Sequence, residues 1–283
     1  MTVYSTYYYK SEGYGDFIRS LLAVFVYCKE NNIEHKLYIP DHPLNKCLEC
    51  LTEKLDYPNK TFVIIGECDT KPIVDELNRC KNPNYNVIIY SNIYTFVSLE
   101  LLKKYVGEFR EFLKLSDAVK QRIVALKNQI NNVDYTAIQI RCGDKFMECH
   151  AFSGNDNRVD PHQDILYRKL AKTIDYLKIN YTSPSAPNGL PTCIFTDVKS
   201  LRDRVCGQYG LLCFDTEIHH MGSKSDNDNV FIDTVAEFEL LGEAKTVIIF
   251  SPTGFAYWSA FIHDVPLFIC DDLTHKIVPF ERL

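Results

Sequence analysis

The chain has 283 residues, of which 46% are hydrophobic and 24% charged, which is enough to form one large or two medium α/β units. Its formal net charge of −6 argues against a nucleic-acid partner bound through bulk charge. The longest apolar runs, such as 21–27, are too short to span a bilayer, and the first residues lack the pattern of a signal peptide. We therefore expect a soluble, cytoplasmic protein without membrane insertion.

The first half of the sequence alternates strand and helix patterns. Alternating aromatic and polar residues predict a strand over 3–9, followed by a turn that contains Gly13, Gly15 and Asp16. An apolar face at helical spacing then predicts a helix over 17–31. Further short strands are predicted over 36–39, 62–65 and 87–90. This order is typical of a doubly wound parallel sheet.

A helical segment separates this half from a second one. Residues 99–132 are predicted to be mostly helical, with Ser116 as the N-cap of a long helix, and to form a hinge at about 100–132. The alternation then restarts, with strands over 137–141, 192–196, 211–214, 246–250 and 267–270, and helices over 165–179, 200–209, 231–244 and 254–263. We predict an α/β protein with two domains, over 1–115 and 133–283, and a cleft between them.

The eleven cysteines give no metal-site pattern. Their number is odd and they lie in apolar contexts. Cys47 and Cys50 form a lone C-x-x-C pair without a second pair or histidines at zinc-ligand spacing. Asp226-Asn227-Asp228 imitates a D-x-D metal motif but lies in a polar loop. We expect reduced thiols and no bound metal.

The residues most suggestive of chemistry follow predicted strands. Arg141 ends the apolar run 137–140, where a cation is costly unless an anion meets it. Ser251 and Thr253 precede a predicted helix, whose free N–H groups either form a plain N-cap or bind an anion. Because parallel strands end at the same edge of a sheet, the two segments together favour a pyrophosphate site.

These segments resemble the motifs of the fucosyltransferase superfamily that includes the α1,2-, α1,6- and protein O-fucosyltransferases. Residues 137–144 resemble its H-x-R-R-G-D motif, 193–197 its F-S-D-D motif and 253–261 its S-T-F-S-W-W-G-A-W motif. The turn at 13–16 is similar to its G-x-G-N turn. The motifs occur in the family's order and cover most of the chain. The resemblance implies a GT-B fold of two Rossmann-like domains and an inverting, metal-independent transfer from a nucleotide sugar to a glycan hydroxyl.

The resemblance also implies roles for the matching residues. Arg141 would bind the donor β-phosphate, while Asp197 and Glu237 would lie near the nucleoside. The pyrophosphate would be bound by Ser251, Thr253, Gly254 and Phe255, and the transferred sugar would face Gly13, Gly15 and Asp16. Four acids are candidates for the general base of such a transfer. They are Glu148, Asp144, Asp16 and Asp69.

Three positions depart from the family pattern. The motif histidine is Gln139, the second motif arginine is Cys142, and the asparagine of the glycine turn is Asp16. Because the family's histidine and asparagine lie close to the donor, the choice of donor stays open between GDP-fucose and a UDP-sugar such as UDP-xylose or UDP-rhamnose. A nucleotide- or sugar-binding module without catalysis is a further alternative. A kinase or phosphatase is disfavoured because the sequence has no G-K-[ST] loop and no nucleophilic C-x5-R.

Overall fold

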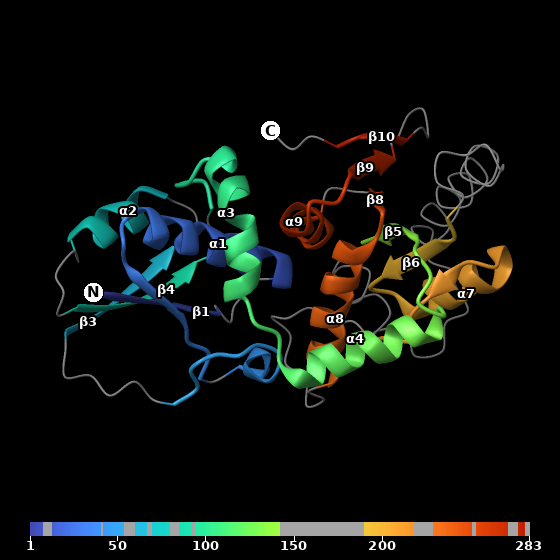
Figure 1. The fold of residues 1–283 in the computed structure, drawn as a ribbon, viewed down its shortest axis with the longest axis horizontal. Helices are drawn as coiled ribbons and strands as arrows, with labels where there is room; N and C mark the ends of the chain where they lie inside the picture. Colours follow the sequence, from blue (N-terminus) through green and yellow to red (C-terminus); the bar gives the residue numbers. More distant parts are fainter. Residues whose placement is uncertain are drawn as a thin grey trace, which may run out of the picture.

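Two sheets, the first parallel and the second mostly parallel, form the two lobes of the computed structural model together with their helices (Figure 1). It describes residues 1–7, 13–40, 42–53, 60–66, 70–79, 85–91, 94–141, 190–217, 229–250, 253–270 and 277–280. The helix predicted over 165–179 lies outside these residues. In the part of the chain that is described, no helix is both long and apolar enough to cross a membrane.

The first lobe is built on a fully parallel sheet. Its strands are β1 (Thr2–Thr6), β2 (Glu34–Leu37), β3 (Lys60–Gly66) and β4 (Tyr85–Ser91), in the order β2-β1-β4-β3. The helices are α1 (Tyr14–Glu30) and α2 (Thr70–Arg79), with a short 3-10 turn, η1, at Pro43–Lys46. α1 and α2 cover one face of this sheet, where Ile73 and Leu77 of α2 pack with Val3 of β1 and Val87 of β4.

The second lobe is built on a six-stranded sheet. Its strands are β5 (Thr136–Ile140), β6 (Thr192–Thr196), β7 (Leu212–Cys213), β8 (Thr246–Ile249), β9 (Leu267–Cys270) and β10 (Ile277–Pro279). The order is β10-β9-β8-β5-β6-β7, parallel throughout except for β10, which runs antiparallel to β9. α7 (Lys199–Tyr209) packs on one face through Leu201 and Val205. The other face is covered by α8 (Asn229–Glu243) and α9 (Gly254–His263).

The predicted helical segment is two helices, α3 (Leu99–Phe112) and α4 (Asp117–Gln129). The side chains of Ser98 and Ser116 accept hydrogen bonds from the backbone N–H groups of Leu101 and Val119, so the predicted Ser116 cap is confirmed. α3 contacts α1 and α9, and α4 crosses one end of α8 and packs against it (Figure 1). The segment therefore contacts helices of both lobes.

One apolar core continues across the two lobes. Buried side chains of α1 and α3, such as Leu21 and Phe109, belong to the same cluster as Phe238 of α8 and Trp258 of α9. Trp258 is fully buried, as expected for a core residue, and its ring lies edge-on to Tyr94. The lobes are thus held together by packed helices at the level of α1 and α9, which fixes the position of the helix starts described next.

Candidate functional site

The starts of α1 and α9 touch each other through two glycines. A Cβ placed on Gly15 would lie 2.6 Å from both the carbonyl carbon and oxygen of Gly254, and 2.7 Å from Cα of Phe255. Only a residue without a side chain allows two backbones to approach so closely. The glycine turn of the first lobe and segment 253–255 of the second lobe, which the sequence predicts to face one cleft, are therefore in direct contact.

Asp16 lies between these two helix starts. One of its carboxylate oxygens accepts a hydrogen bond of 3.4 Å from the N–H of Gly13, the N-cap residue of α1. The other forms an ion pair of 3.2 Å with Arg19, one turn further along α1. A Cβ on Gly254 would lie 3.1 Å from Asp16 Oδ1, so the carboxylate also lies against the start of α9. Its negative charge is favourable there, because a helix start carries partial positive charge.

Thr253 is the N-cap residue of α9. Its hydroxyl accepts a hydrogen bond of 3.2 Å from the N–H of Phe255, which supports the capping role that the sequence left open beside anion binding. The Phe255 ring lies edge-on to Phe238 at 5.2 Å between centroids, and Tyr14 contacts the same Phe238 ring at 4.9 Å. These rings anchor both helix starts on α8.

Arg141 and Asp197 meet at the ends of neighbouring strands. The register pairs Ile140 of β5 with Thr196 of β6, so the next residue of each strand lies at the same sheet edge. Arg141 Nη1 lies 3.2 Å from Asp197 Oδ2, and the Asp197 side chain is only 4% exposed. The predicted strand-end arginine therefore has an anionic partner within the protein, and its 29% exposed side chain still reaches solvent.

Gln139 lies two residues before Arg141 on β5, beside Ile249 of β8. It is 5% exposed, and its amide oxygen has no hydrogen-bond partner among the described residues. A buried acceptor without a donor costs free energy, of the order of 1–3 kcal/mol. This position is where the motif histidine stands in the fucosyltransferases that the sequence resembles.

Glu237 belongs to a buried polar cluster on the same side of the second lobe. Its carboxylate accepts a hydrogen bond from the Thr216 hydroxyl, and that hydroxyl accepts one of 2.9 Å from Arg202. Burial raises the pKa of Glu237 to about 7, although Thr216 and Arg202 both act to lower it, and the charges of Asp233 and Asp197 raise it further. The interaction with Asp197 connects this cluster to the strand ends.

Sequence reasoning did not find several of these partners. Arg19 could have been found, because Asp16 directly precedes the predicted helix and lies three residues before Arg19, a spacing at which opposite charges meet on a helix. Arg202 and Thr216 gave no signal, since a charged residue on a polar helix and a threonine in a loop are ordinarily solvated. A second ion pair, of the half-buried Arg122 with Asp233 at 2.6 Å, was also missed.

Several predicted site residues lie outside the described residues. They are Ser251, Asp144, Glu148, Cys142 and Asp69, together with the loop 226–228. Of the four candidate bases, the structure therefore describes only Asp16. Among the residues that it does describe, no group of three or more metal-ligating side chains occurs, and no disulfide joins the cysteines.

The chain was compared with known proteins by sequence and by structure. No family model and no curated protein matches the sequence. Solved structures match its fold over nearly the whole chain. NodZ alpha-1,6-fucosyltransferase co-crystallised with GDP has a TM-score of 0.61 at 16% identity, with 98% of each chain covered.

Two further structures are similar at lower identity. A mutant of Arabidopsis thaliana FUT1 in complex with GDP has a TM-score of 0.59 at 10% identity and covers 95% of this chain and 70% of its own. POFUT1 in complex with GDP has a TM-score of 0.51 at 8% identity and covers 94% of this chain and 98% of its own. The protein therefore has the GT-B fold of these fucosyltransferases, as the sequence motifs implied.

Proposed function

We propose that the protein is a glycosyltransferase that moves fucose from GDP-fucose to a hydroxyl group of a glycan acceptor, with inversion and without a metal ion. The observation that carries the proposal is the contact of two helix starts, at Gly15 and Gly254. In the second lobe, Arg141 and Asp197 follow the ends of two neighbouring strands and form an ion pair. The fold is shared with enzymes crystallised with GDP or GDP-fucose. Domain 133–283 would bind the donor and domain 1–115 the acceptor.

The proposed reaction needs a group that takes up negative charge on the leaving diphosphate. In an inverting transfer, the acceptor oxygen forms a bond to the anomeric carbon while the bond to the β-phosphate oxygen breaks. Arg141 would contact that phosphate through its guanidinium, and the N–H groups at the start of α9, after Ser251 and Thr253, would add partial positive charge. Phe255 and Gly254 would shape this end of the site, and Gly13 and Gly15 the sugar side.

The acceptor hydroxyl must also lose its proton to a base. Both Asp16 oxygens already have partners, in Gly13 and Arg19, so we favour a positioning role for Asp16. Glu148 remains our candidate base, on the resemblance to the fucosyltransferase motif, with Asp144 as the second candidate. A Glu148→Gln variant that binds GDP normally but loses turnover by about 100-fold or more would support this assignment.

A UDP-sugar is the second candidate donor, and Gln139 is the observation that favours it. Gln139 replaces the family's histidine and keeps a buried amide oxygen that a ligand donor could satisfy. With a UDP-sugar as donor, the fold and the reaction would stay the same and only the nucleotide would differ. Asp197 and Glu237 would then lie near a uracil instead of a guanine.

Thermal unfolding with GDP, UDP and their sugars, each in EDTA, tests the proposal. A ligand bound by the folded protein at 100 times its Kd stabilises it by about 2.7 kcal/mol. We expect GDP to raise Tm in the wild type and in Arg110→Ala, an exposed arginine on α3, but not in Arg141→Ala. Stabilisation by UDP but not by GDP would identify a UDP-sugar as the donor in place of GDP-fucose. No response to any nucleotide would contradict the proposal. Release of GDP from GDP-fucose in the same samples separates an enzyme from a binding module.

A further inference from the structure

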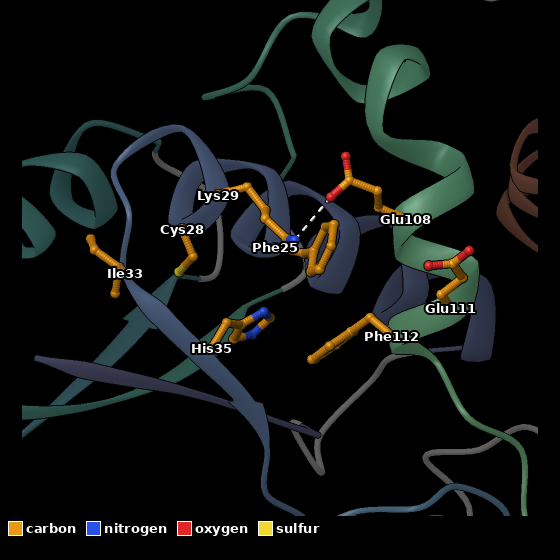
Figure 2. Close-up of a pocket in the computed structure, with 8 residues that line it drawn as sticks. All are labelled: Phe25, Cys28, Lys29, Ile33, His35, Glu108, Glu111 and Phe112. Carbon is orange, nitrogen blue, oxygen red and sulfur yellow. Dashed lines mark hydrogen bonds and ion pairs between the residues drawn. The ribbon is translucent and has the colours of Figure 1, made fainter.

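A cavity of about 300 Å³ lies between the last turns of α1, the start of β2 and the end of α3 (Figure 2). Its lining residues are Phe25, Cys28, Lys29, Ile33, His35, Glu108, Glu111 and Phe112. At 1.5 Å per residue along α1, Cys28 lies roughly 20 Å from Gly15. The cavity is therefore separate from the proposed donor site at the start of that helix.

Three aromatic rings form one side of the cavity, and Figure 2 shows them turned toward one another. The rings of His35 and Phe112 stack with centroids 4.9 Å apart and planes at 17°, and Phe25 lies 5.0 Å from Phe112. His35 is fixed by a hydrogen bond of 2.8 Å to Ser5. Burial lowers the pKa of His35 to about 3, so the imidazole is uncharged at neutral pH. The wall is neutral and does not repel a cation.

The charged residues that line the cavity carry an excess of negative charge. Lys29 Nζ lies 2.9 Å from a carboxylate oxygen of Glu108 and 5.4 Å from the centroid of the Phe25 ring. An ammonium group of the chain itself is thus held between a ring and a carboxylate. Glu111 contributes a second, exposed carboxylate next to Phe112, and among the described residues no cation pairs with it.

We propose that this cavity binds the ammonium group of a small organic cation, held by Glu111 and the rings of Phe112 and His35. Phe112 and Glu111 would offer an incoming ammonium group the same two kinds of contact, a ring and a carboxylate, that Phe25 and Glu108 offer Lys29. A cation near an aromatic face is attracted by the ring quadrupole, and a nearby carboxylate adds a charge interaction. A volume of about 300 Å³ is at the lower end of small-molecule sites, which limits the ligand to about the size of one sugar ring.

Both an amino sugar and a simple alkylammonium ion carry an ammonium group of this kind. Saturation-transfer NMR with the full chain distinguishes them, using glucosamine, N-acetylglucosamine and tetramethylammonium at a pH where glucosamine is protonated. We expect glucosamine to bind and N-acetylglucosamine, which has the same ring without the charge, to give no signal. Binding of tetramethylammonium as well assigns the site to the cation alone, and its absence assigns it to the amino sugar.

Variants locate the binding. Glu111→Gln and Phe112→Leu should each weaken binding about fivefold or more, the effect expected for one cation contact. Glu100→Gln, an exposed acid in the first turn of the same helix, should leave it unchanged. Circular dichroism checks the fold of Phe112→Leu, and Glu111→Gln alters only an exposed side chain. Equal signals from the two sugars, no binding of any cation, or unchanged binding in Glu111→Gln would overturn the proposal.

Discussion

Replacing Gly15 with alanine should separate the two helix starts that define the candidate site. The new Cβ would lie 2.6 Å from two backbone atoms of Gly254, whereas an ordinary contact needs 3.4 Å or more, so the segments must part by about 0.8 Å. Neither neighbour is a flexible side chain, and both belong to helices packed in the common core. Overpacking of this kind costs about 1–3 kcal/mol.

Both the melting temperature and the rate of donor turnover should fall in Gly15→Ala. For a chain of this size, each kcal/mol lowers Tm by about 2–4 °C, so we expect a fall of about 2–12 °C by calorimetry. A displacement near 1 Å at a reacting site costs about 100-fold in rate, and we expect donor turnover to fall by that order.

A matched glycine provides the control. In Gly107→Ala, the Cβ would meet nothing within 4 Å, because Gly107 lies exposed in the middle of α3. This change should raise stability by up to about 1 kcal/mol, since alanine favours a helix over glycine. If Gly15→Ala were as stable and active as Gly107→Ala, the close contact between α1 and α9 would be refuted.

Three further predictions concern the same site. Gly254→Ala brings a Cβ to 3.1 Å from Asp16 Oδ1, the end of a side chain that can shift, so we expect Tm to fall by only a few degrees while turnover falls about tenfold, measured by product release. The pKa of Glu237 is raised from 4.5 to about 7, so the folded state binds more protons than the unfolded state. The free energy of unfolding that protonated Glu237 contributes is therefore lost as pH rises from about 4.5 to 7. Glu237→Gln should remove this loss. In denaturant titrations, the free energy of unfolding of the variant relative to wild type should therefore increase by roughly 3 kcal/mol over that pH range. A difference that stays constant with pH would contradict the raised pKa of Glu237 as the cause. Arg141→Lys keeps the charge beside Asp197 but lacks the planar guanidinium, which binds a phosphate through two parallel N–H groups on separate nitrogens. GDP affinity should therefore fall about tenfold or more by calorimetric titration with little change in Tm.

The elements with strong periodicity could be predicted from the sequence. The strand before Arg141 and the helix over 254–263 are found where apolar spacing placed them. α2 and β10 were not predicted. α2 is short and polar, with Ile73 and Leu77 as its buried apolar residues, and β10 has only three residues, ending in Pro279. Such elements form through tertiary contacts that local patterns do not contain.

The candidate site was predictable to the extent that topology determines it. Arg141 and Asp197 could be placed together because residues after neighbouring parallel strands share an edge. The contact of Gly15 with Gly254 could not, since it depends on how two helices from different lobes cross. Nor could the burial of Arg202, because the sequence does not show that Thr216 and Glu237 fold against it.

The proposed function is tested most directly by measuring GDP release from GDP-fucose, in EDTA and with a glycan acceptor mixture, by wild type and Arg141→Ala. The proposed role of Arg141 at the donor phosphate predicts turnover by the wild type and a loss of about 100-fold or more in the variant. Turnover that is the same in both proteins, or no turnover of GDP-fucose or any UDP-sugar by the wild type, would contradict it.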